Sequence, residues 1–154
     1  MAIEIERKFL ACREKLPPLG AGIQIEQGYI ATVNGSTVRV RKTPTEAFLC
    51  IKSKPINFSR QEFEYQIPTA DAEQMLQSLC ISQHLHKIRY HVNFGGQMWE
   101  VDVFEGRNQG LIVAEIELQS EHQGIKLPPW VDEEVTLEER FSNYQLALKP
   151  YSEW

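Results

Sequence analysis

Acidic and basic residues recur in same-sign pairs, spaced two apart, along most of this 154-residue chain. The acidic pairs are Glu4–Glu6, Glu62–Glu64, Glu100–Asp102 and Glu115–Glu117, and the basic pairs are Arg39–Arg41, Lys52–Lys54 and Lys87–Arg89. Clustered carboxylates bind hard divalent cations such as Mg²⁺ or Mn²⁺ through oxygen. Paired Arg and Lys side chains bind phosphate oxygens. The two sets together predict a site for a metal-bound polyphosphate.

A spacing of two places both members of a pair on one face of a β-strand, because successive side chains alternate between faces. In the opening stretch, Glu4, Glu6 and Lys8 alternate with Ile3 and Ile5. Same-sign neighbours on one strand face repel each other, so this segregation costs stability unless a ligand compensates. Exposed charge is often structurally idle, however, so the pattern alone leaves a solvated surface open as well.

The charges on these faces suit a metal-bound phosphate ligand if they line one space. There are eight acids and, with Lys8, seven bases, which leaves one net negative charge. Two divalent ions would bring the sum to about +3, which suits an oligophosphate carrying roughly four negative charges. A barrel of about eight strands with a polar interior can hold one small ligand.

The remaining pattern predicts one mainly β domain of the α+β class over residues 1–154. Strand patterns cover residues 1–10, 23–31, 36–42, 47–54, 60–67, 84–92, 97–106 and 111–120. Asn34-Gly35 predicts a type I′ hairpin turn. Pro68 opens a helix whose apolar stripe runs from Ala72 to Cys80. Short strands joined by hairpins indicate an antiparallel barrel or sandwich.

The C-terminal part changes character after Pro128-Pro129, which we expect to end the strand region. Thr136, followed three residues later by Glu139, predicts a capping box at a helix start. Apolar residues then follow helical spacing from Leu137 to Leu148, and Ser142-Asn143 could divide this helix into two turns.

Composition limits the functional classes. A net charge of −5 and a pI near 5.4 argue against general nucleic-acid binding. No apolar run is long enough to cross a bilayer, and the charged N-terminus lacks a signal peptide's apolar region. Cys12, Cys50 and Cys80 are unclustered, which suits reduced thiols and a cytoplasmic location. The sequence is compatible with a homodimer.

The segment EIERK resembles the E-x-E-x-K signature of the CYTH domain, also called the triphosphate tunnel metalloenzyme family. The resemblance continues in order through VRVRK, FLCIKSK, EFEYQI, HKIRYHV, WEVDVFEG, LIVAEIEL and EVTLEERFSN. It implies a closed antiparallel eight-stranded β-barrel, or tunnel, that binds a triphosphate with divalent metal. It also implies helices packed on the outside, with the segments around Met75 and Phe141 as candidates.

The resemblance assigns roles to individual residues. It implies metal ligands at Glu4, Glu6, Glu115 and Glu117, with Glu62, Glu64 and Asp102 as further ligands or water-mediated supports. It implies phosphate binding by Arg39, Arg41, Lys52, Lys54, Lys87 and Arg89. Lys8 with Tyr29 would form the catalytic pair, and two Mg²⁺ or Mn²⁺ ions would share the site.

Three functions follow from this assignment. Metal-dependent hydrolysis of inorganic triphosphate (tripolyphosphate) to pyrophosphate and phosphate is preferred, because this short chain shows no insertion that could build a pocket for a base. A nucleotide-using enzyme, either a class IV-type adenylate cyclase or a thiamine or nucleoside triphosphatase, is the first alternative. A polyphosphate-binding module without turnover is the second.

Overall fold

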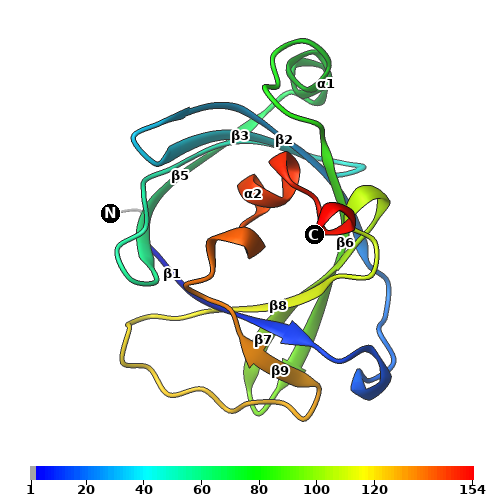
Figure 1. The fold of residues 1–154 in the computed structure, drawn as a ribbon, viewed down its shortest axis with the longest axis vertical. Coiled ribbons are helices and arrows are strands. Elements are labelled where there is room, and N and C mark those ends of the chain that lie inside the picture. Colours follow the sequence, from blue (N-terminus) through cyan, green and yellow to red (C-terminus); the bar gives the residue numbers. More distant parts are fainter. Residues whose placement is uncertain (1–2) are drawn as a thin grey trace.

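Eight strands close into an antiparallel ring, and a ninth strand pairs with it from outside (Figure 1). The structure is a computed structural model that describes residues 3–154; Met1 and Ala2, at the start of the predicted opening strand, lie outside the described residues. The sheet order is β5-β4-β3-β2-β6-β7-β8-β1-β9, and pairing of β5 with β1 closes the ring. The predicted closed eight-stranded tunnel is therefore confirmed.

The strands are β1 (Ile3–Ala11), β2 (Ile23–Val33), β3 (Ser36–Lys42), β4 (Ala47–Lys52), β5 (Ser59–Ile67), β6 (Leu85–Phe94), β7 (Gln97–Phe104), β8 (Ile112–Glu117) and β9 (Val131–Glu134). The two α-helices are α1 (Thr69–Ser78) and α2 (Asn143–Leu148). Short 3₁₀ turns cover Arg13–Lys15, Gly106–Asn108, Glu139–Phe141 and Tyr151–Glu153. Among residues 3–154, no helix has the length and apolar character needed to cross a membrane.

The strand register sets opposite charges beside each other at several positions inside the ring, although Glu6 faces Glu117 and Glu100 faces Glu115. Lys52 on β4 lies directly across from Glu62 on β5, and Lys8 on β1 lies across from Glu115 on β8. Opposite charges at facing positions attract, so neighbouring strands compensate the like-charge repulsion along each single strand. The paired strands thus hold a charged interior that one strand alone could not stabilise.

The outer faces of the strands are apolar and are covered in two places. α1 packs Ala72 and Leu76 against Val40 and Ala47, outside β3 and β4 (Figure 1). On the other side of the barrel, a cluster around the buried Trp99 covers the outer faces of β1, β7 and β8. The predicted outward packing of the helix around Met75 is confirmed.

The turn between β2 and β3 has the geometry that the sequence predicts. Asn34 and Gly35 both have positive φ, at 52° and 82°, as a type I′ turn requires. A Cβ atom on Gly35 would lie 2.9 Å from side-chain carbons of Lys54, so only glycine allows this close approach. The hairpin therefore packs beside Lys54.

The chain after Pro129 differs from the prediction in two respects. β9 continues the strand region beyond the two prolines and pairs with β1. Thr136 does not cap a helix, because its Oγ1 accepts a hydrogen bond from the Lys8 backbone N–H at 3.0 Å. Instead Ser142 caps α2, accepting from the Gln145 N–H at 3.2 Å. The expected division at Ser142-Asn143 is confirmed, since a 3₁₀ turn precedes α2.

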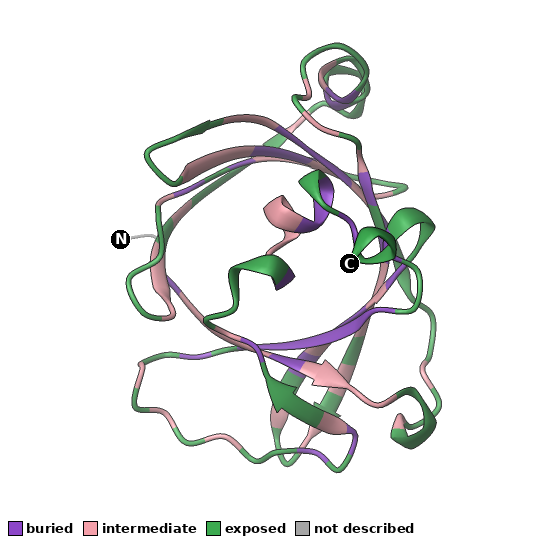
Figure 2. Ribbon diagram, in the orientation of Figure 1, coloured by how far each residue is buried: buried purple, intermediate pink, exposed green. Residues whose placement is uncertain are grey.

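The Phe141 segment packs inside one end of the barrel and not on its outside. Figure 1 shows α2 within the outline of the ring, and Figure 2 shows buried residues in this segment. Phe141 and Leu146 contact a cluster that includes Leu10 and Val113. Leu10 continues the inward face of Lys8, and Val113 continues that of Glu115, because each is two residues away on its strand. This end of the interior is therefore apolar and is filled by the C-terminal segment.

The segment of α1 and Cys80 packs closely against the barrel at Gly28 of β2. A Cβ atom there would lie 2.4 Å from Cys80 Sγ and 3.0 Å from Leu76 Cδ2. We expect Gly28→Ala to lower the free energy of unfolding by about 1 to 3 kcal/mol through overpacking. Urea denaturation measures this change. Gly20→Ala is the control, because a Cβ atom at Gly20 meets nothing within 4 Å; equal effects of both substitutions would contradict this packing.

Candidate active site

A cavity of about 510 Å³ lies between the tunnel wall and the C-terminal segment. Seven residues of the predicted site line it, namely Glu4, Glu6, Lys8, Tyr29, Arg39, Lys52 and Lys54. Residues 135–139 and 142–145 close one side of it. A second cavity of about 500 Å³, beside Leu76 of α1 and the Gly106–Asn108 turn, contains none of the predicted site residues. The tunnel cavity is therefore the candidate active site.

Glu4 is held by two basic side chains at the wall of this cavity. Lys52 Nζ donates to both of its carboxylate oxygens, at 3.1 and 3.0 Å, and Arg60 Nε donates to Oε1 at 3.0 Å. Burial alone would raise the pKa of Glu4, but attraction to Lys52 and Arg60 lowers it well below the ordinary value. Arg60 was missing from the predicted site, although its spacing of two from Glu62 puts it on the same strand face.

Glu6 is a weakly compensated carboxylate at the wall of this cavity. Among the described residues, the one basic atom within 4.0 Å of its carboxylate is Arg60 Nη2, at 3.8 Å. Desolvation, together with repulsion from Glu115 and Glu4, raises the pKa of Glu6 to about 7. Gathered carboxylates that lack positive charge, as here, fit an oxygen-bound divalent cation.

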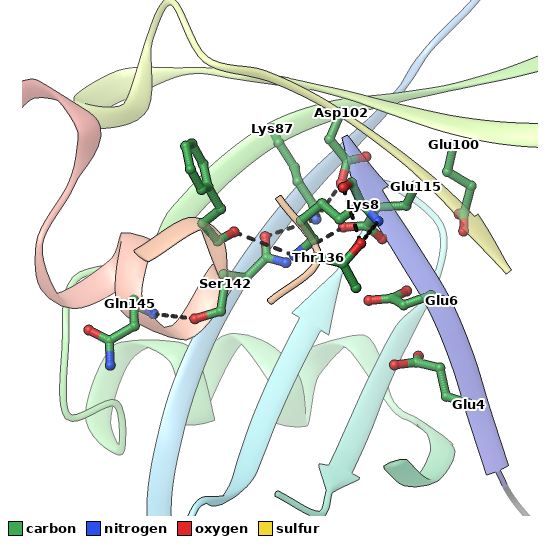
Figure 3. A network of polar contacts seen from close by, with 12 residues as sticks. Glu4, Glu6, Lys8, Lys87, Glu100, Asp102, Glu115, Thr136, Ser142 and Gln145 are labelled. Carbon is green, nitrogen blue, oxygen red and sulfur yellow. Dashed lines mark hydrogen bonds and ion pairs between the residues drawn. The ribbon is translucent and has the colours of Figure 1, made fainter. Parts of the chain in front are cut away.

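Lys8 is fixed by the opposite strand and by the C-terminal segment (Figure 3). Its Nζ lies 3.6 Å from Glu115 Oε1 and donates to the Phe141 carbonyl oxygen at 3.4 Å. Burial would raise the pKa of Glu115, but Lys8, Arg89 and other bases lower it to about 2. Glu115 is thus an ionised carboxylate inside the protein, beside Glu6.

Asp102 joins two bases in a fully buried network. Its oxygens accept from Lys87 Nζ at 2.8 Å and from Arg89 Nε and Nη2 at 2.8 and 2.9 Å. Burial opposes ionisation of Asp102, but these two cations lower its pKa. Burial also lowers the pKa of Lys87 to about 8. Since its oxygens already bind Lys87 and Arg89, the geometry favours a positioning role for Asp102 over direct metal ligation.

The other predicted acids and bases lie on the tunnel wall outside the lining of the cavity, and Glu117 lies directly across from Glu6. Glu62 pairs with Lys52 at 3.1 Å, and Glu64 pairs with Arg41 at 2.9 Å. The structure does not bring eight predicted residues into the lining of the cavity, namely Arg41, Glu62, Glu64, Lys87, Arg89, Asp102, Glu115 and Glu117. Within residues 3–154, the one group of three donors within 4.8 Å of one another is Cys50, Glu62 and Glu64. The predicted carboxylate ligands are therefore partly paired with bases.

Tyr29 is buried and lines the cavity, as its spacing of two from Gln27 predicts. Its ring packs edge-on against Tyr144 of the C-terminal segment, with centroids 5.2 Å apart. The Lys8 ammonium is directed to Glu115 and to the Phe141 carbonyl group. A catalytic pairing of Lys8 with Tyr29 stays a prediction.

An antiparallel eight-stranded tunnel, with acids and bases facing each other across its interior, defines a class of charge-lined β-tunnel proteins. The family model of the CYTH domain matches residues 2–147, and the chain belongs to this family. The CYTH triphosphatase family is metal-dependent.

Two curated relatives match nearly the whole chain. An inorganic triphosphatase of Acetivibrio thermocellus is 40% identical over 151 residues, covering 98% of this chain and 97% of the relative. An inorganic triphosphatase of Nitrosomonas europaea is 40% identical over 149 residues, covering 94% and 97%. A crystal structure described as an inorganic triphosphatase has 36% identity and a TM-score of 0.66, covering 94% of this chain and 97% of that one. A protein of Pyrococcus horikoshii, at 19% identity and a TM-score of 0.60, shares the fold.

Substitution of Asp102 tests its role as the counter-ion of Lys87 and Arg89. Asp102→Asn would leave two buried cations short of a negative charge, so we expect a loss of about 3 to 5 kcal/mol in unfolding free energy. Mg²⁺ affinity, measured by calorimetry on the folded variant, should change by less than threefold. Glu133→Gln, on the exposed strand β9, is the control for both measurements. A selective loss of Mg²⁺ affinity in Asp102→Asn would instead make Asp102 a metal ligand.

The raised pKa of Glu6 predicts a pH-dependent gain of stability in Glu6→Gln. The folded state binds the proton more tightly than the unfolded state, whose pKa is near 4.5, so the native side chain's contribution is present below pH 4.5 and lost as pH rises through 7. Without metal, Glu6→Gln should be more stable than the native protein at pH 8, by at most roughly 3 kcal/mol, and similar at pH 4.5. Thermal unfolding in EDTA measures this. A variant equally destabilised at both pH values would refute the assignment.

Proposed function

We propose that this chain is an inorganic triphosphatase, a metal-dependent hydrolase that cleaves tripolyphosphate to pyrophosphate and phosphate inside the tunnel. The observation that carries the proposal is the gathering of Lys8, Arg39 and Lys52 around one cavity with Glu4 and Glu6. Matches of 40% identity to inorganic triphosphatases, over nearly the full length, support the same substrate.

In this proposal the basic residues bind and orient the substrate. Lys52 and Arg60 donate hydrogen bonds to Glu4 in the present structure. With substrate bound, they would donate some of these hydrogen bonds to phosphate oxygens instead. Arg39 is 7% exposed, and its Nε has no protein partner among the described residues, so it has bonding capacity for a phosphate. Cations fixed around the triphosphate stabilise the charge that develops on the transferred phosphoryl group and on the leaving pyrophosphate.

We further propose that Glu4, Glu6, Glu115 and Glu117 hold Mg²⁺ or Mn²⁺, with two ions per site. Repulsion from Glu115 and Glu4 contributes to the raised pKa of Glu6, and a cation bound beside these carboxylates would offset that repulsion. When bound, a divalent ion would neutralise phosphate charge and lower the pKa of a bound water. The protein groups contribute the carboxylate oxygens, the enclosed cavity and the bases that face it. Glu62 and Glu64 would support this set by keeping Lys52 and Arg41 in place.

Other expectations from the sequence also enter as proposals. We infer that residues 1–154 form one domain, because the sheet of the described residues closes into a single ring. We infer a cytoplasmic location from Cys12, Cys50 and Cys80, which are free thiols in the structure. Size-exclusion chromatography with light scattering will decide between a monomer and the homodimer that the sequence leaves open.

A substrate panel tests the function. With Mg²⁺, the protein should release phosphate from tripolyphosphate faster than from ATP or thiamine triphosphate, because the cavity lining includes five bases and four carboxylates. Phosphate release and product chromatography measure both rate and product. A preference for ATP with a cyclic product would favour an adenylate cyclase, and tight binding without turnover would favour a binding module.

Glu4→Gln tests the carboxylates of the same site. It should reduce turnover at saturating Mg²⁺ by about 100-fold, since the ligand set and the fixed positions of Lys52 and Arg60 both depend on that charge. Glu133→Gln is the control, with the same change of charge at an exposed position on β9. Full activity of Glu4→Gln would remove Glu4 from the proposed site.

A further inference from the structure

Asn143, the first residue of α2, touches both the tunnel cavity and Lys87. Lys87 Nζ donates to Asn143 Oδ1 at 3.1 Å and to Asp102 Oδ2 at 2.8 Å. Asn143 lines the cavity, whereas Lys87 is 1% exposed and is not part of the lining. The amide of Asn143 therefore lies at the boundary between the buried Lys87–Asp102 pair and the space where substrate would bind.

The contact with Lys87 determines which way this amide faces. An ammonium group has only donors, so it bonds the carbonyl oxygen of an amide and not its NH₂ group. The NH₂ group of Asn143 must then point away from Lys87. Lys87 occupies only the carbonyl oxygen, and Asn143 lines the cavity whereas Lys87 does not, so the NH₂ group is the part of this amide that remains to serve the cavity. An NH₂ group there can donate a hydrogen bond to an anionic oxygen.

The backbone that carries Asn143 is held in place on both sides. Ser142 caps α2 through the Gln145 N–H, at 3.2 Å. Leu146 is fully buried in the apolar cluster that fills this end of the barrel. The side chain is oriented by Lys87 and the main chain by the cap and the core, so the donor is positioned before any ligand arrives.

We propose that Asn143 is a substrate-contacting residue whose amide NH₂ group donates to a phosphate oxygen of the triphosphate. The inference rests on the proposed function, because it takes the substrate from it. Lys87 is then a positioning residue, which acts on the substrate through Asn143. The neutral amide supplies a donor without adding charge to a tunnel that already contains many bases.

Two substitutions at Asn143 test the contact. Asn143→Asp keeps the shape and replaces the NH₂ group with an anionic oxygen, so KM for tripolyphosphate should rise at least 10-fold and kcat/KM should fall about 100-fold. Asn143→Ala removes the donor without adding charge, and kcat/KM should fall about 10-fold, mainly through KM. Calorimetric titration of inorganic tripolyphosphate into metal-free protein should show a weaker affinity for both variants, in the same order.

Asn93→Asp is the matched control, because Asn93 is exposed on the same strand as Lys87 and is not part of the cavity lining. It should keep the native KM and tripolyphosphate affinity. Native binding in Asn143→Asp, or a loss of kcat alone together with a lower unfolding temperature, would overturn the contact. If the native protein binds tripolyphosphate without hydrolysing it, the titrations still decide the role of Asn143, and the proposed function alone fails.

Discussion

The tunnel depends on the pairing of most of its buried charges with opposite charges, and among the described residues Arg39 is the exception. Lys52 and Arg60 bind Glu4, and Lys87 and Arg89 bind Asp102. An ion removed from water loses several kcal/mol of hydration, which only close opposite charges and hydrogen bonds can offset. In the present structure the carboxylates occupy the bases that phosphate would need, and the bases occupy the carboxylates that a cation would need. Ligand binding would therefore be an exchange of partners within a preformed network.

Much of the fold could be predicted from the sequence because its main signal is local. Alternation of apolar and charged residues identifies each strand and its inward face, as for Val38 and Arg39 on β3. The sign of the charge adds a second signal, since the same-sign pairs indicate that some strand faces are acidic and others basic. Asn34-Gly35 determines the β2–β3 turn through its own backbone geometry. None of these inferences needs a contact between distant parts of the chain.

The position of the C-terminal segment could not be predicted from such local patterns. Its place follows from contacts with residues far away in sequence, such as Phe141 with Leu10 and Val113. Each of these residues alone fits an ordinary apolar position in a strand or helix. Thr136 shows the same limit, because a threonine followed by a glutamate three residues later satisfies the capping pattern, while the backbone of Lys8 offers it a different partner.

The residue types of the candidate site could be predicted from the sequence, but the burial of each side chain could not. Lys52 and Lys87 look alike in sequence, each in a basic pair on a strand, yet Lys52 lines the cavity, whereas Lys87 is buried outside the lining and bonds Asn143. The difference arises from the C-terminal segment, which covers one part of the wall and leaves the other part open. Sequence periodicity determines the face of a strand on which a side chain lies, but not what covers that face.

Charge is balanced over the whole tunnel and unbalanced at one point. With Arg60 added, the interior faces carry eight acids and eight bases, so the formal sum is zero. Burial, and then repulsion from Glu115 and Glu4, raise the pKa of Glu6, so an ionised Glu6 is less favourable there than in water. A cation gains most at this point, and once it is bound the tunnel has an excess of positive charge. Cation binding thus creates the surplus that attracts a polyanion, and the two ligands should bind cooperatively.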